Sequence, residues 1–186
     1  RALVDRCFGH MLEEVHRFEG TVNQFTGDGV MALFGAPLAL EEAPRRAVMS
    51  ALAIQRALAV CRDEVRASSG IDLQVRIGIH TGLVVVGRIG NDLRMEYTAI
   101  GDTTNLASRL QTLAAPGTIV VSEATHRLAG RFFETRDLGP QLVKGKTDPV
   151  RVYEVVGERP AARGLDAIAD RGLTPLAGRS RELATL

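Results

Sequence analysis

Strand-like segments in this chain occur in pairs joined by short turns, and helix-like segments separate the pairs. One pair, 21–25 and 29–34, flanks a Thr-Gly-Asp-Gly turn, which is a strong signal for a β-hairpin. A second pair, 83–89 and 95–100, flanks an Asn-Asp turn. Hairpins make neighbouring strands antiparallel. The pattern therefore predicts an α+β fold in which helices pack on a mixed, largely antiparallel sheet.

Apolar residues recur at helical or alternating spacing along most of the chain. They predict helices over 1–18, 41–66, 103–113 and 123–128, and further strands over 73–80, 117–121, 132–138 and 150–155. We expect the strand 73–80 to turn at Thr81-Gly82 into the strand 83–89. That turn places His80 in a hairpin, where a hydrogen-bonded packing role is more common than a catalytic one.

Composition excludes several classes of protein. The 186 residues are 24% charged and 45% hydrophobic, as in an ordinary globular domain, and the net charge of +1 argues against a nucleic-acid surface. No apolar run reaches the roughly 18 residues of a membrane span. Cys7 and Cys61 lie far apart on predicted helices, which indicates reduced core residues and a cytoplasmic protein.

A shift in composition predicts the organisation into domains. Residues 1–156 carry the regular pattern, and from Gly157 the chain becomes rich in Arg, Ala, Gly and Pro. We interpret 1–156 as one domain and 157–172 as a linker that leads into residues 173–186. The chain opens inside a helix-like pattern without a start Met, so we expect it to be N-terminally truncated.

Asn105 and Arg109 stand four positions apart near the start of a predicted helix, so both project from one helix face. Arg offers a rigid fork of donors for charge that is spread over several oxygens. An amide beside a guanidinium therefore suits a polyphosphate or a ribose. A surface Arg and a helix-end amide without a ligand remain the plain alternative.

Asp28 lies at the predicted tip of the first hairpin, between two glycines. Glycine lets a backbone approach a ligand closely, and a carboxylate there can hold Mg²⁺ together with phosphate oxygens. On local sequence alone, a Gly-Asp-Gly turn without a ligand is the more frequent case.

The stretch from Tyr97 to Arg109 has the pattern Y-x-x-x-G-x-x-x-N-x-A-S-R, which closely resembles the signature of bacterial class III nucleotidyl cyclases. Three more blocks, 24–35, 76–82 and 142–150, resemble the same family and follow in its order. The resemblance implies a ferredoxin-like, palm-type fold. It also implies synthesis of cyclic AMP or cyclic GMP in intracellular signalling.

The resemblance assigns a role to each matching site residue. Asn105 would orient the ribose, Arg109 would stabilise charge on the reacting phosphate, and Lys144 would meet the triphosphate. Asp28 would be the second of two metal-binding aspartates. The first lies, in the family, on a strand before residue 1. The resemblance thus implies two Mg²⁺ or Mn²⁺ ions per complete site and little activity from this fragment alone.

The pair that recognises the base is where this chain departs from the family. Adenylyl cyclases commonly use Lys and Asp there, and guanylyl cyclases use Glu and Cys. The corresponding residues are Gln24 and Thr98, whose amide and hydroxyl can each donate or accept. We expect ATP as the substrate with loose base selection, and GTP stays open. As an alternative, both are ordinary strand residues.

The resemblance also implies partners. In the family the site forms between two subunits, one supplying the metal aspartates and the other Asn105 and Arg109, so a head-to-tail homodimer is expected. Residues 173–186 resemble the entry to a P-loop ATPase domain that follows some bacterial cyclase domains. The competing hypothesis is a catalytically inactive cyclase-like module that dimerises and regulates that ATPase.

Overall fold

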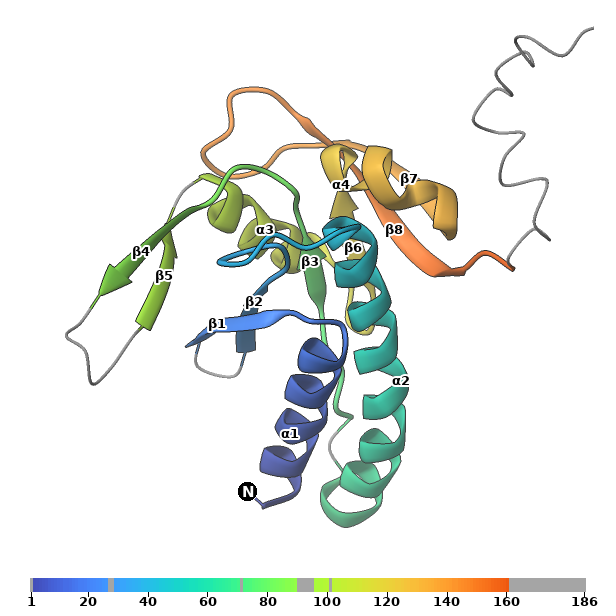
Figure 1. The fold of residues 1–186 in the computed structure, drawn as a ribbon. Coiled ribbons are helices and arrows are strands. Elements are labelled where there is room, and N and C mark those ends of the chain that lie inside the picture. The colour runs from blue at the N-terminus through green and yellow to red at the C-terminus, as the bar shows by residue number, and fades with distance from the viewer. Residues whose placement is uncertain (1, 27–28, 71, 90–95, 101, 161–186) are drawn as a thin grey trace, which may run out of the picture.

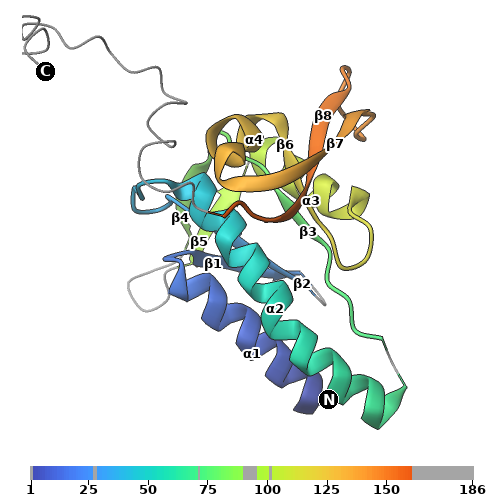
Figure 2. The ribbon, with the colours of Figure 1, turned by 90° about the vertical axis from the view of Figure 1, so that its right-hand side faces the viewer.

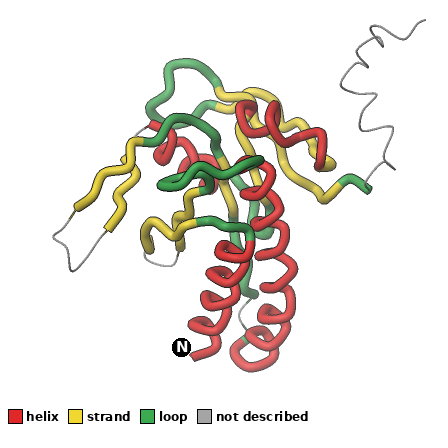
Figure 3. The backbone as a smooth tube through the Cα atoms, viewed as in Figure 1, coloured by secondary structure: helices red, strands yellow, loops and turns green. Residues whose placement is uncertain are grey.

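The computed structural model describes residues 2–26, 29–70, 72–89, 96–100 and 102–160. Helices and strands interleave along the chain, as expected (Figures 1 and 3). The order is α1 (Ala2–Arg17), β1 (Thr21–Thr26), β2 (Gly29–Leu33), α2 (Ala43–Ser69), β3 (Ile77–Ile79), β4 (Val85–Ile89), β5 (Glu96–Ile100), α3 (Asp102–Leu113), β6 (Ile119–Ser122), α4 (Glu123–Ala129), a 3₁₀ turn (Gly130–Phe132), β7 (Phe133–Gln141) and β8 (Val150–Glu158).

The strands form one four-stranded sheet and two hairpins. The sheet has the order β3-β6-β8-β7, in which only β3 and β6 are parallel. β1 pairs with β2 and β4 pairs with β5, both antiparallel. These pairings confirm the predicted hairpins on either side of residues 27–28 and 90–95. The predicted mixed, largely antiparallel architecture is also confirmed.

Strand β6 is the centre of the core, and all four of its residues are buried. Because side chains alternate along a strand, β6 contributes side chains to the packing on both faces of the sheet. Ile119 and Val121 pack with apolar residues of α2 and α4, whereas Val120 packs with Leu106 and Leu110 of α3. The sheet therefore lies between α2 with α4 on one face and α3 on the other (Figure 2).

Helices α1 and α2 pack side by side below this sheet (Figures 1 and 2). Cys7 and Cys61 meet in their interface, where both are free and buried, as the sequence predicts. Burial, together with the neighbouring Cys61 thiol, raises the pKa of Cys7 to about 11. A thiol with so high a pKa stays protonated at neutral pH, which makes Cys7 an apolar packing residue and a poor nucleophile.

Two expectations about residues 73–89 are wrong. Of the predicted strand 73–80, only Ile77–Ile79 is a strand, because Leu73 and Val75 pack against the α1–α2 core instead of pairing with a strand. β3 pairs with β6, so His80 does not lie in a hairpin between β3 and β4. The alternating pattern here reflects packing on α2 rather than a long strand.

The predicted domain boundaries remain predictions. Strand β8 ends at Glu158, two residues beyond the predicted end of the domain, and 161–186 lie outside the described residues. Among the residues that the structure describes, no helix has the length and apolar character needed to cross a membrane.

Candidate active site

Helix α3 presents the predicted pair on its outer side. Leu106 and Leu110 are buried in the sheet-facing core, which fixes the rotation of the helix. Asn105 is consequently exposed and Arg109 half-buried, one turn apart. The prediction that the amide and the guanidinium share one helix face is confirmed.

Beside α3 lies a turn made by residues 143–146, which we call the Lys-Gly-Lys turn. The backbone N–H of Lys146 donates to the carbonyl of Val143 over 2.9 Å, closing a four-residue turn. Gly145, the third residue, has φ +75°, as a type II turn requires, and glycine adopts that angle without strain. Lys144 is thereby exposed at the corner of the turn.

The Lys-Gly-Lys turn touches α3 at two points. A Cβ atom at Gly145 would lie 3.0 and 3.1 Å from the two terminal nitrogens of Arg109, so the guanidinium rests against this glycine. Lys146 Nζ forms an ion pair with the carboxylate of Asp102, the first residue of α3. Arg109 and the turn that carries Lys144, which are distant in sequence, are therefore neighbours in space.

The ion pair lowers the pKa of Asp102, chiefly through the hydrogen bond from Lys146. A carboxyl whose pKa is lowered by folding contributes stability above its unfolded pKa and loses it as the pH falls through the folded value. The Lys146–Asp102 pair is therefore intact at neutral pH and is lost only in acid. The Lys146 side chain is 30% exposed and that of Asp102 is 65% exposed, so the pair itself adds little to the stability of the fold.

Two polar contacts lie near the first turn of α3. His80 shares a 2.8 Å hydrogen bond with Ser122, the residue that caps α4, and Thr103 donates to the carbonyl of Leu83 over 2.6 Å. Burial lowers the pKa of His80, with opposing smaller effects of Asp102 and Lys146, so the imidazole is neutral at pH 7. His80 thus makes a hydrogen bond of the kind that a packing role predicts, and that role stays a prediction.

The structure places the other candidates on neighbouring strands. Gln24 is exposed on β1, where it pairs with Met31, and Thr98 lies on β5 opposite Gly87. β1 contacts β5, which brings the two base-recognition candidates onto adjacent strands. Asp28 and the side chain of Thr98 lie outside the described residues, so their predicted roles stay predictions.

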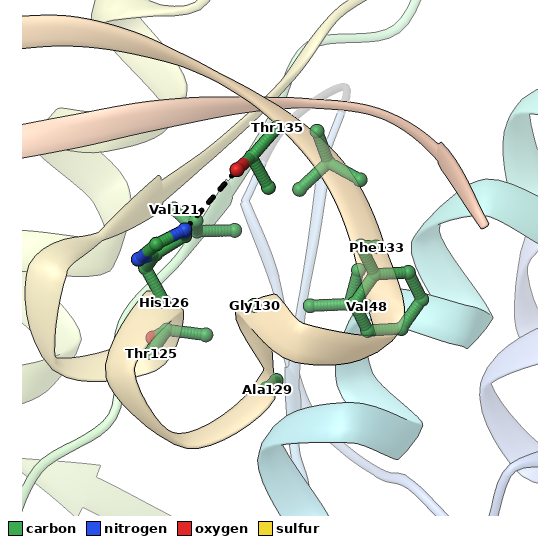
Figure 4. A pocket seen from close by; sticks show the side chains of 9 residues that line it. Val48, Val121, Thr125, His126, Ala129, Gly130, Phe133 and Thr135 are labelled. Carbon is green, nitrogen blue, oxygen red and sulfur yellow. Dashed lines mark hydrogen bonds between the residues drawn. The ribbon is translucent and has the colours of Figure 1, made fainter. Parts of the chain in front are cut away.

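A small apolar pocket lies elsewhere, between α2, α4 and strands β6 to β8 (Figure 4). His126 points into it, hydrogen-bonds Thr135 over 3.1 Å and stacks on Tyr153 at 3.8 Å between ring centroids. None of the candidate site residues lines this pocket. Its histidine has two structural partners, and we interpret it as part of the core.

Sequence reasoning missed Asp102, Gly145 and Lys146. A carboxylate that begins a helix is common because it suits the helix dipole, so Asp102 carried no special signal. The glycine between two lysines was a usable signal for a tight turn. The contact between the turn and α3, however, joins residues 44 positions apart.

Comparison with known proteins points to one group of enzymes. The sequence profile of the adenylate and guanylate cyclase catalytic domain matches residues 3–157. Adenylate cyclase 1 of Rhizobium meliloti (strain 1021) is 37% identical over 158 residues, which are 84% of this chain but 24% of that protein. This chain thus spans about a quarter of that curated relative.

Solved structures agree in fold. The adenylyl cyclase CyaB from P. aeruginosa superposes with a TM-score of 0.79 and 35% identity, covering 85% of this chain and 82% of that one. The guanylyl cyclase Cya2 gives a TM-score of 0.76 and 33% identity, covering 87% and 82%.

Proposed function

This chain belongs to the adenylate and guanylate cyclase catalytic domain family, and on that premise we propose that it converts ATP into 3′,5′-cyclic AMP and pyrophosphate. One observation carries the proposal. Arg109 rests against Gly145 of the Lys-Gly-Lys turn, so its guanidinium, the exposed Lys144 and the amide of Asn105 lie along one end of α3. That is a polyphosphate-binding surface with a polar group for a sugar.

The arrangement suits phosphoryl transfer. In the proposed reaction the ribose 3′ oxygen forms a bond to the α-phosphorus, the bond to the bridging oxygen breaks, pyrophosphate leaves and the 3′ proton passes to solvent. Such a reaction depends mainly on positioning and charge stabilisation. Asn105 would orient the ribose, Arg109 would take up charge on the α-phosphate, and Lys144 would hold the leaving phosphates.

Divalent ions would supply charge neutralisation at the phosphates when bound. Residues 27–28 connect the paired strands β1 and β2, whose register closes with Thr26 opposite Gly29. A carboxylate at that connection is of the ligand type that Mg²⁺ and Mn²⁺ prefer, and we propose Asp28 as a metal ligand. The described residues contain no group of three or more metal-ligating side chains.

We propose a head-to-tail homodimer as the functional form. Large apolar side chains are solvent-exposed in this single chain, among them Phe25 on β1 at 63%, Leu83 just before β4 at 96% and Val85 at the start of β4 at 74%. Such exposure on neighbouring hairpins is expected of a face that another subunit covers. We also propose that the enzyme is cytoplasmic and that an ATPase domain begins near residue 173.

A two-substrate assay on the full-length protein tests the function. With Mn²⁺ present, we expect cyclic AMP from ATP at a higher kcat/KM than cyclic GMP from GTP. A preference for GTP would make the chain a guanylyl cyclase, which Gln24 and Thr98 also permit. Absence of both products, with nucleotide binding retained, would favour the inactive regulatory module instead.

The metal role of Asp28 predicts a shift in metal requirement. Asp28→Asn keeps the size of the side chain but removes its charge, so we expect the Mn²⁺ concentration for half-maximal activity to rise about tenfold or more. Asp5→Asn on exposed α1 is the matched control and should leave the titration unchanged. An unaltered Mn²⁺ titration of Asp28→Asn would remove this residue from the metal site.

A further inference from the structure

We infer that the Lys146–Asp102 ion pair is a latch that fixes the Lys-Gly-Lys turn against α3, so that the two lysines of the turn have separate tasks. Lys144 meets the nucleotide phosphates, and Lys146 is a positioning residue that does not touch them. This inference rests on the proposed function and deepens it.

The turn is fixed at its first residue by burial. The side chain of Val143 is 4% exposed and packs with Leu106, Leu110 and Val152 in the core beneath α3. The hydrogen bond from Lys146 N–H to the Val143 carbonyl then joins the two ends of the turn. Movement of the turn is therefore restrained on the side that faces the sheet.

On the side of the turn that faces solvent, the Lys146–Asp102 ion pair is the remaining restraint on movement of the turn. Lys146 reaches Asp102 at the start of α3, and Gly145 between them lies against the Arg109 guanidinium. If the ion pair opens, the turn can tilt about Val143, and the surface that holds Arg109 tilts with it. In the described part of the chain Lys144 has no ion-pair partner. Of the two lysines in the turn, it is therefore the one whose ammonium group is available to a phosphate.

The composition of the chain makes this division testable. Among its 23 basic residues, Lys144 and Lys146 are the two lysines and the rest are arginines. Within these 186 residues, an amine-specific reagent therefore modifies side chains of this turn alone. The modified lysine is identified by mass spectrometry after proteolysis.

The first test is acetylation of the full-length protein with an N-hydroxysuccinimide ester. We expect Lys144 to react about tenfold faster than Lys146, because Lys144 is exposed, whereas the Lys146 amine is half-buried and held by the Asp102 carboxylate. Asp102→Asn should raise the rate at Lys146 toward that of Lys144 and leave Lys144 unchanged. If Asp102→Asn does not change the rate at Lys146, there is no latch.

The second test is affinity for inorganic tripolyphosphate, measured by calorimetry. Lys146→Met and Asp102→Asn should each weaken binding about threefold to tenfold, and the double variant should lose little more, since both remove one interaction. Lys146→Arg keeps the pair and should bind like the parent. Arg56→Met, which breaks the exposed pair with Glu158, controls for loss of a surface ion pair.

The direction in which Asp102→Asn changes the affinity for tripolyphosphate separates a latch from direct phosphate binding by Lys146. If Lys146 itself met the phosphates, Asp102→Asn would free it and remove a nearby negative charge, so tripolyphosphate would bind as well or better. That result would overturn the inference. Under the latch, Asp102→Asn weakens binding despite the more favourable charge, and in an active enzyme it lowers kcat about tenfold with a smaller change in KM.

These outcomes are independent of the reaction. If the parent protein makes no cyclic nucleotide, the proposed function fails, while labelling and tripolyphosphate binding still decide whether the latch exists. Suppose instead that the parent is active, that Asp102→Asn leaves the labelling rate at Lys146 unchanged, and that this variant binds tripolyphosphate as well or better. The proposed function then stands and the latch does not exist.

Discussion

Replacing Arg109 by alanine should lower kcat for cyclic AMP formation by about 10²-fold or more while the protein stays folded. The guanidinium is half-buried beside Gly145 and is proposed to act where charge develops on the α-phosphate. Removing such a charge-stabilising group lowers the turnover rate but does not unfold the protein. The measurement is steady-state turnover with ATP and Mn²⁺, together with the thermal midpoint of each variant.

Two further variants sharpen this result. Arg109→Lys keeps the charge but loses the planar fork, so we expect it to recover only part of the lost rate. Arg56→Ala removes an arginine from the exposed face of α2 and should leave turnover unchanged. If Arg109→Ala raises KM and leaves kcat intact, Arg109 holds the ground-state triphosphate and is not a transition-state group.

The outline of this site could be predicted because its signals are local. Spacing of four residues on a helix is enough to put Asn105 and Arg109 on one face, and buried Leu106 and Leu110 show which face turns outward. Likewise the turn residues between β1 and β2 were sufficient to predict that hairpin.

What could not be predicted depends on distant partners. Leu73 and Val75 alternate like strand residues, but the surface they cover belongs to the α1–α2 pair. β3 reaches its partner β6 only through the α3 crossover, because parallel strands cannot be joined by a tight turn. The Lys146–Asp102 pair likewise exists only once α3 and the Lys-Gly-Lys turn have packed.

The same crossover leaves no room for a side chain at Gly78, in the middle of β3. Helix α3 passes directly over it: a Cβ atom at position 78 would lie 2.1 Å from the backbone nitrogen of Gln111 and 2.4 Å from the carbonyl oxygen of Ala107. Both are helix backbone atoms, which cannot rotate away as a side chain can. The strand itself is held by its pairing with β6, where Gly78 lies opposite Val120.

Gly78→Ala should therefore displace α3 by about an ångström, lowering the free energy of unfolding by about 3 kcal/mol and kcat by about 10²-fold. The second effect follows because α3 carries Asn105 and Arg109. Chemical denaturation and steady-state turnover measure the two effects. Gly157→Ala, a glycine of β8 whose added Cβ would meet nothing within 4 Å, should change neither. A Gly78→Ala protein with parental stability and turnover would mean that α3 does not lie against β3.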